Sequence, residues 1–136
     1  MIQIRELDHL VLRAQDPQTM IAFYCDVLGC DLEKTQAKFG LYQLRAGQSI
    51  IDIVSVDGEL GRMGGRGPEQ EGRNLDHFCL RVDPFDEANI REHLANHSIY
   101  PEPSAPRYGA EGVGPSLYIT DPENNVVELK GPPTVG

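Results

Sequence analysis

An internal repeat constrains the fold of this chain more than any other sequence feature. Residues 7–14 read LDHLVLRA and residues 75–82 read LDHFCLRV, so that five of the eight positions are identical. The two histidines lie half of the 136-residue chain apart. A repeat at that spacing indicates one supersecondary unit used twice. In the first copy, Leu10 and Leu12 alternate with His9, Val11 and Arg13, which favours a β-strand with one apolar face.

The first copy is followed by signals for one helix and three strands. Asp16 and Pro17 are typical of an N-cap followed by proline in the first helical turn. Apolar residues then recur at helical spacing as far as Leu28, and Gly29 is typical of a helix end. We expect the three strands at residues 31–35, 40–46 and 49–56.

The second copy is followed by a similar order of signals. Asp83 and Pro84 again predict a helix start, and the helix should run to about Asn96. We expect a short strand near Ile99 and then a long loop, which is often functional. The loop should span residues 101–115, and two closing strands should follow it at 116–120 and 125–130.

The expected fold class is therefore α+β, with two βαβββ modules in one chain. The predicted single domain, residues 1–136, consists of module 1 (1–56), a Gly-rich linker (57–73) and module 2 (74–136). The Gly-rich linker does not follow a strand and open a helix, so a phosphate-binding loop is a weak interpretation of it.

Charge and composition exclude several classes of partner. The net charge is −9 without any cluster of lysine or arginine, which argues against binding to nucleic acid or to an anionic membrane surface. No apolar run approaches the ~18 residues of a membrane-spanning helix, and the N-terminus lacks a signal-peptide pattern. The odd number of cysteines predicts reduced thiols in a cytoplasmic protein, with Cys25 and Cys79 buried.

Each half offers one histidine on its first strand and one carboxylate on its last strand. These residues are His9 and Asp52 in the first half and His77 and Glu128 in the second. One histidine on a half-buried strand is more often a hydrogen-bonded core residue than a metal ligand. Two histidines at equivalent positions, with two carboxylates in apolar strands, are costly to bury without a partner. The pattern is therefore also consistent with a divalent metal site.

Other polar residues have two interpretations each. Arg13 lies ~13 Å along the strand from His9, and could hold the anionic end of a substrate or form a surface ion pair. Arg107 and Tyr108 could close over a ligand or belong to an ordinary solvated loop. His93 and His97 are four residues apart without the glutamate of a zincin motif, which favours an exposed helix face.

Three stretches of the chain resemble the vicinal oxygen chelate superfamily, most closely glyoxalase I. They are residues 7–29, 75–82 and 114–132, the last reading GPSLYITDPENNVVELKGP. This superfamily also contains fosfomycin-resistance proteins, bleomycin-binding proteins and extradiol dioxygenases. The resemblance implies the glyoxalase/bleomycin resistance/dihydroxybiphenyl dioxygenase-like fold, with paired βαβββ modules, a metal site within a cup-shaped sheet, and a homodimer.

The resemblance also implies roles for individual residues. His9, His77 and Glu128 match the metal ligands of the family, and Asp52 falls where glyoxalase I has a glutamate ligand one methylene longer. Arg13 matches an arginine that holds a glutathione carboxylate in glyoxalase I. The asparagine that serves the same tripeptide is replaced here by Val56.

The resemblance implies a metal-dependent, glyoxalase-like lyase or isomerase. One divalent ion per site, Zn, Ni, Fe or Mn, would chelate adjacent oxygens of a small α-oxo or α-hydroxy substrate, free or conjugated to a thiol, and stabilise an enediolate. Glu128 or Asp52 would move the proton, while Arg13, Arg107 and Tyr108 would bind the substrate. The alternatives are a fosfomycin-resistance-type thiol transferase, a small dioxygenase, or a protein that sequesters a small molecule without turnover.

Overall fold

A computed structural model describes residues 1–134 of the chain. Contacts divide the chain into two compact units, Met1–Glu71 and a second that begins at Gly72. Most of the predicted linker, residues 57–73, therefore belongs to the first unit, where it contains the short 3-10 helix η3 (Gly61–Gly64). Residues 135 and 136, the end of the predicted second module, lie outside the described residues.

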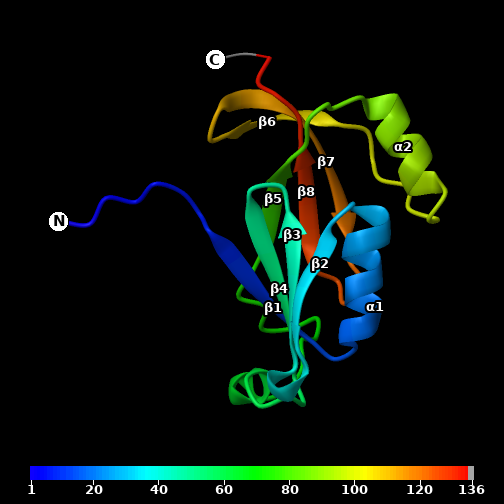
Figure 1. The fold of residues 1–136 in the computed structure, drawn as a ribbon. Helices are drawn as coiled ribbons and strands as arrows, with labels where there is room; N and C mark the ends of the chain where they lie inside the picture. Colours follow the sequence, from blue (N-terminus) through cyan, green and yellow to red (C-terminus); the bar gives the residue numbers. More distant parts are fainter. Residues whose placement is uncertain (135–136) are drawn as a thin grey trace. The chain divides into compact units, whose positions relative to one another are not determined.

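The first unit is a four-stranded sheet with one helical segment against it. Its elements are β1 (His9–Ala14), α1 (Pro17–Ala22), the π-helix η1 (Phe23–Val27), β2 (Asp31–Gln36), the 3-10 helix η2 (Ala37–Phe39), β3 (Leu41–Ala46) and β4 (Ser49–Ser55). The strand order is β1-β4-β3-β2, in which β1 pairs with β4 in parallel and the other pairs are antiparallel (Figure 1). The edge strand β1 is thus joined to the strand that ends the module.

The helix of the first unit begins and ends as its sequence predicts. The Asp16 side chain accepts a hydrogen bond from the Thr19 backbone N–H at 3.2 Å, and Pro17 occupies the first turn. Gly29 ends the segment in a left-handed conformation, at φ +74°. Apolar side chains from this segment and from the strands form the core of the unit: Met20, Tyr24, Leu44, Ile51 and Ile53 are buried.

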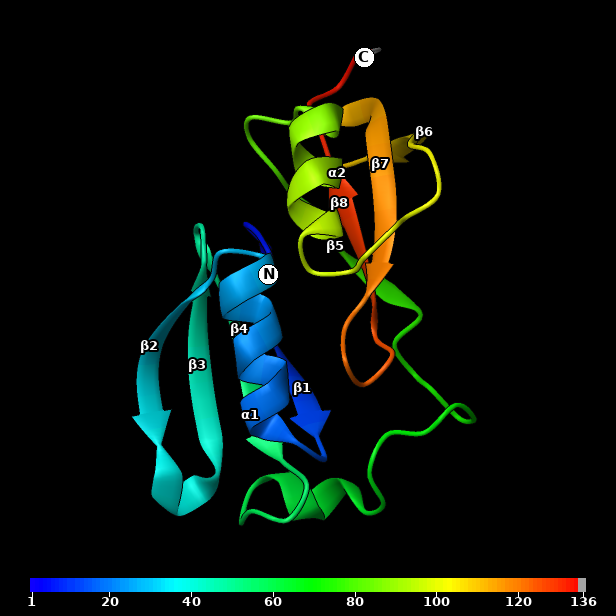
Figure 2. The ribbon, with the colours of Figure 1, turned by 90° about the vertical axis from the view of Figure 1, so that its right-hand side faces the viewer.

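The second unit repeats this order of elements. It contains β5 (His77–Arg81), α2 (Glu87–Ala95), β6 (Ala105–Gly109), β7 (Gly112–Thr120) and β8 (Val126–Lys130). The strand order β5-β8-β7-β6 matches that of the first unit, with β5 and β8 again parallel. Figure 2 shows α1 and α2 each lying against the sheet of its own unit. The predicted α+β class and the two βαβββ modules are confirmed.

The start of α2 differs from the sequence prediction. The N-cap is Asp86, which accepts a hydrogen bond from the Asn89 backbone N–H at 3.1 Å, and the helix begins at Glu87. The predicted N-cap pair Asp83–Pro84 lies outside the helix and is joined by a cis peptide bond. Asp83 and Asp86 both have the residue type of an N-cap, but the N-cap in the structure is Asp86. The predicted helix start was therefore three residues too early. His93 on α2 and His97, which follows this helix, are both exposed, as expected.

The predicted loop over residues 101–115 is instead largely a β-hairpin. Residues 105–109 form β6, residues 112–115 begin β7, and the described residues have no strand at Ile99. Proline is tolerated here because β6 is an edge strand, and Pro115 lies one residue before Ser116, the first residue of β7 that pairs with β8. The proline and glycine content was therefore a misleading loop signal.

None of the helices within residues 1–134 is long and apolar enough to cross a membrane.

Candidate metal and substrate site

His77 and Glu128 meet because their strands are parallel neighbours. Residue 77 pairs with Val126 and residue 79 with Glu128, so the histidine and the carboxylate project from the same face. His77 Nε2 lies 3.1 Å from Glu128 Oε1. Glu128 is only 6% exposed, and its other oxygen, Oε2, accepts a hydrogen bond from Ser116 Oγ at 2.6 Å. The buried carboxylate thus has a partner on each oxygen.

The preceding aspartate holds the other ring nitrogen of His77. Asp76 Oδ2 lies 2.7 Å from His77 Nδ1. The hydrogen bond to Asp76, followed by the charge of Glu128, raises the pKa of His77 above its usual value, against the opposing effect of burial. A carboxylate on one ring nitrogen is typical of metal-binding histidines, because it fixes the ring and leaves the other nitrogen for the metal.

The first unit repeats this arrangement around His9. Asp8 Oδ1 lies 2.7 Å from His9 Nδ1, and this hydrogen bond is the main reason that the pKa of His9 is raised. Asp52 occupies the position on β4 that Glu128 occupies on β8, two residues beyond the partner of the histidine. Asp52 is 4% exposed, and its Oδ1 accepts a hydrogen bond from Gln43 Nε2 at 3.3 Å.

The four predicted metal ligands therefore form two pairs, one in each unit. Within residues 1–134, no three histidine, cysteine, aspartate or glutamate side chains gather closely enough to hold a metal ion. The chemistry of the donors nevertheless fits a divalent ion, since imidazole nitrogen and carboxylate oxygen suit Zn, Ni, Fe and Mn. In the second unit, the imidazole nitrogen Nε2 of His77 and the carboxylate of Glu128 face each other on one side of the sheet.

Arg13 is bonded to the linker. Its Nε donates to the Gly61 carbonyl at 2.9 Å, Nη1 donates to the Arg66 carbonyl at 3.0 Å, and Nη2 donates to the Gly65 carbonyl. Gly64 packs so closely that an added Cβ would come within 2.4 Å of Arg13 Nε. Arg13 therefore makes backbone contacts in place of the surface ion pair expected as one alternative, and its role in substrate binding stays a prediction.

A cavity of about 350 Å³ lies beside the His77–Glu128 pair in the second unit. Tyr108 is among its lining residues, while Arg107 lies with its guanidinium carbon 6.0 Å from the ring centre of Tyr118. Both predicted substrate-binding residues are on the strand β6 rather than on a loop, so closure over a ligand would have to move a hairpin. Their contact with substrate stays a prediction.

The sequence did not identify Lys130 and Ser116 as site residues, and it predicted a buried environment for Cys79. Cys79 is exposed, not buried, because it lies on the same strand face as His77. Lys130 lines the cavity two residues after Glu128, and Ser116 supports Glu128 from β7. The two-residue period of a strand could have pointed to Cys79 and Lys130 once His77 and Glu128 were chosen as site residues.

Residues 6–129 match the model of the Glyoxalase/Bleomycin resistance protein/Dioxygenase superfamily. The chain belongs to this superfamily. Among curated proteins, this glyoxalase-superfamily chain is 27% identical over 139 residues to the glyoxalase domain-containing protein RDO1 of Mycosarcoma maydis, covering 94% of the chain and 69% of RDO1. The resemblance on which the expected fold rested is confirmed at the level of the superfamily.

Solved structures show the same fold as this superfamily member. The integron cassette protein VCH_CASS1 of V. cholerae matches with a TM-score of 0.77 and 27% identity, over 96% of this chain and 98% of that one. At lower identity, which shows the fold alone, the lactoylglutathione lyase of Agrobacterium tumefaciens matches with a TM-score of 0.65 and 21% identity, over 93% and 92% of the two chains. The fosfomycin resistance protein FosX of Listeria monocytogenes matches with a TM-score of 0.69 and 19% identity, over 94% and 91%.

Proposed function

We propose that this protein is a metal-dependent, glyoxalase-like lyase or isomerase that acts on a small α-oxo or α-hydroxy substrate. One observation carries the proposal. An Asp–His pair and a buried carboxylate occur twice, with the carboxylate at the same register position on the neighbouring parallel strand. A purely structural histidine would not need the same aspartate and the same carboxylate position in both units.

We assign His9, Asp52, His77 and Glu128 as the ligands of one divalent ion. When bound, the ion would act as a Lewis acid toward adjacent oxygens of the substrate. Asp8 and Asp76 hold the imidazole rings through Nδ1, so that Nε2 would be the atom available to the ion on both histidines. The homologous positions of the ligands on strands suit a site that tolerates little positional error.

Glu128 is the better candidate for moving a proton. It is buried, one of its oxygens is held by Ser116, and the other lies beside the cavity and close to His77. A carboxylate placed in this way can accept a proton from a substrate carbon and return it to a neighbouring atom. Asp52 is the equivalent group of the first unit, where its side chain accepts a hydrogen bond from Gln43.

The comparisons support this class of reaction without selecting a substrate. A lactoylglutathione lyase and a fosfomycin resistance protein share the fold. The alternatives are a fosfomycin-resistance-type thiol transferase, a small dioxygenase and a protein that only sequesters its ligand, and they are the competing outcomes of the assay below.

The test is metal analysis followed by an activity assay. The purified protein should contain about one divalent ion per site. His77→Ala should lose most of it, because even the loss of a residue that only orients a ligand typically costs about 10–100-fold in metal affinity, and the loss of the ligand itself costs more. His97→Ala removes an exposed histidine that follows α2 and should keep the metal. Activity on methylglyoxal plus a thiol should then return with one of the restored metals.

Full metal content in His77→Ala would reject the ligand assignment. Metal-dependent consumption of fosfomycin with a thiol, but not of a hemithioacetal, would move the protein to the thiol transferase class. Stoichiometric protection of a ligand without any product would identify a sequestering protein.

A further inference from the structure

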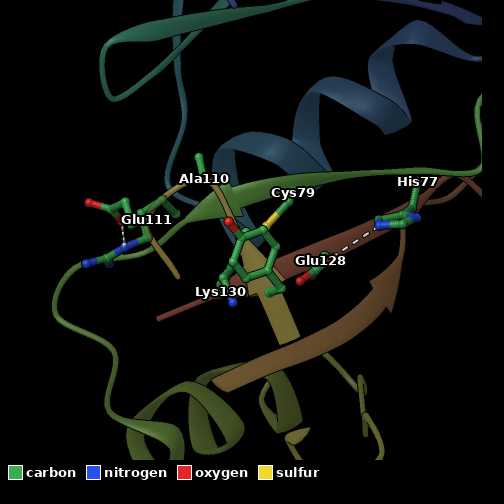
Figure 3. Close-up of a pocket in the computed structure, with 9 residues that line it drawn as sticks. His77, Cys79, Ala110, Glu111, Glu128 and Lys130 are labelled. Atoms are coloured by element: carbon green, nitrogen blue, oxygen red, sulfur yellow. Dashed lines mark hydrogen bonds and ion pairs between the residues drawn. The ribbon is translucent and has the colours of Figure 1, made fainter. Parts of the chain in front are cut away.

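The cavity beside His77 has two ends of different chemistry. Figure 3 shows His77 at one end and Glu111 at the other, with Cys79, Glu128 and Lys130 between them. The side of the cavity with His77 and Glu128 carries two of the four proposed metal ligands. The Glu111 end carries Arg81, whose Nε donates to Glu111 Oε1 at 2.7 Å. The proposed function uses only the first of these two ends.

Lys130 is a buried cation held by backbone groups. The residue is 6% exposed, and its Nζ donates to two backbone carbonyls, that of Gly114 at 3.1 Å and that of Arg107. Across residues 1–134, no carboxylate forms an ion pair with it. An ammonium has three N–H donors, so one remains after these two bonds. Buried charges in proteins are normally paired, and an unpaired one is costly.

Arg81 supplies a second cation at the same place. It pairs with Lys130 in the parallel ladder between β5 and β8, and both side chains line the cavity. Besides its bond to Glu111, its Nη1 donates to the Val82 carbonyl at 2.5 Å. A guanidinium has five N–H donors, and these contacts leave several of them for a ligand. Glu111 is a solvent-exposed partner, so this ion pair can be exchanged at modest cost.

The equivalent arginine of the first unit has a different environment. Arg13 donates from all three of its nitrogens to linker carbonyls. The two copies of the repeat therefore use the same residue differently: the first arginine fixes the linker, while the second lines a cavity beside a buried lysine.

We propose that Lys130 and Arg81 form an oxyanion-binding site, which holds a carboxylate or phosphonate group of the substrate. Lys130 lies ~7 Å along β8 from Glu128, and Arg81, its register partner, lies ~13 Å along β5 from His77. The substrate class is therefore a small anion whose reacting oxygens are separated from its charged group by a few bonds. The assignment of the reacting end rests on the proposed function, whereas the anion site itself does not.

The test measures binding to metal-free protein, so that it does not depend on turnover. The probes are succinate, methylphosphonate and the uncharged succinamide, each titrated by calorimetry or by NMR. Lys130→Met and Arg81→Met should each weaken the binding of the preferred anion by about tenfold or more, which is the usual effect of losing a hydrogen bond to a charged group. Lys34→Met, which removes an exposed lysine of β2 and the same net charge, should bind like the wild type.

Cys79 offers a second measurement at the same cavity. Alkylation by iodoacetate forms a carbon–sulfur bond from the thiolate and releases iodide, and so does alkylation by the neutral iodoacetamide. If the two cations attract oxyanions, the ratio of the iodoacetate rate to the iodoacetamide rate at Cys79 should fall several-fold in Arg81→Met. Cys25, read by mass spectrometry in the same sample, should keep its ratio.

Preference for succinate over methylphosphonate would identify a carboxylate substrate, and the reverse preference a phosphonate or phosphate. The proposal is overturned if neither anion binds better than succinamide, or if both variants bind like the wild type. Should Lys130→Met fail to fold, Arg81→Met and the alkylation ratio decide the question, because the Arg81 side chain is 35% exposed. Anion binding in a protein that lacks metal-dependent activity would leave this site standing and reject the proposed function.

Discussion

At the scale of single residues, the two histidines owe their properties to the aspartates that precede them. A hydrogen bond to Asp76 and the charge of Glu128 favour protonated His77 in the folded protein, so its pKa is raised there. Protonation and metal binding compete for Nε2, which means that the same contacts that orient the ring also make metal affinity fall as the pH falls.

This pKa shift predicts the pH dependence of the metal-free protein. A group with a raised folded pKa stabilises the fold below its unfolded pKa, and this contribution is lost as the pH rises through the folded value. The unfolding free energy contributed by His77 should therefore be present below about pH 6.5 and decline above it. Denaturant titrations at several pH values should show a flatter profile in Asp76→Asn than in the wild type. Identical profiles would contradict the role of Asp76.

Arg13 provides a second test at the residue scale. Its contacts to the carbonyls of Gly61, Gly65 and Arg66 predict that Arg13→Met loosens the linker. We expect a loss of about 1 kcal/mol of unfolding free energy, since these bonds are partly solvent-exposed, and faster limited proteolysis between residues 61 and 68. Arg45→Met, which removes a surface ion pair with Glu33, should leave that cleavage rate unchanged.

The alternative role of Arg13 makes a different forecast for the same variant. If Arg13 binds substrate, Arg13→Met should weaken the binding of an anionic substrate by about 1.5–3 kcal/mol and leave the binding of uncharged substrates unaffected. Unchanged proteolysis combined with a KM effect confined to anionic substrates would favour that role over the linker contact.

At the scale of elements, both units place the histidine strand beside the carboxylate strand through a parallel pairing. The antiparallel hairpins β2–β3 and β6–β7 complete the sheets but contribute none of the four proposed metal ligands. The junctions between elements depend on glycines for two separate reasons. At Gly61 an added Cβ would lie 1.8 Å from the Ser55 carbonyl oxygen, whereas at Gly29 there is open space but φ is +74°.

The same substitution should therefore have different costs at these two junctions. Gly29→Ala should lose about 1–2 kcal/mol, which is the penalty of a left-handed conformation for a residue with a Cβ. Gly61→Ala must displace backbone to remove its steric clash, so its loss of stability should be larger. Urea unfolding of both variants measures the difference, and equal losses would contradict the close approach of η3 to the end of β4.

At the scale of the whole molecule, the resemblance to the superfamily predicts a homodimer, and the N-terminal segment offers apolar surface for one. Ile2, Ile4 and Leu7 are 88%, 85% and 75% exposed, ahead of the edge strand β1. Exposed apolar side chains that follow one another in sequence are common where a protein contacts a partner.

We predict a dimer at micromolar concentration that depends on this segment. The double variant Ile2→Ser, Ile4→Ser should shift sedimentation velocity toward the monomer. Met63→Ser removes an apolar residue of similar exposure, 86%, from the linker and should leave the dimer intact. A strictly monomeric wild type with full activity would exclude a site shared between two chains.

The sequence by itself determined the repeat, the fold class and the choice of the four proposed ligands. These features can be recognised from local sequence patterns. Alternation of apolar and polar residues predicts the strands, and the paired LDH motifs indicate two copies of one unit. The positions of His77 and Glu128 on one face followed once the strands were known. The helix start at Asp86 and the hairpin over residues 105–120 did not, because an aspartate beside a proline and a run of prolines and glycines are each compatible with more than one local structure.

Only the tertiary structure decided how the remaining charged residues are used. Arg13 and Arg81 occupy equivalent positions in the repeat, yet one contacts carbonyls about fifty residues away in the linker and the other lines a cavity with Lys130. Such contacts depend on which distant segments of the chain pack beside the sheet, and a local sequence pattern does not predict that packing. Burial of the Lys130 ammonium against backbone carbonyls is likewise a property of the folded chain, because it arises from the β6–β7 hairpin that covers it.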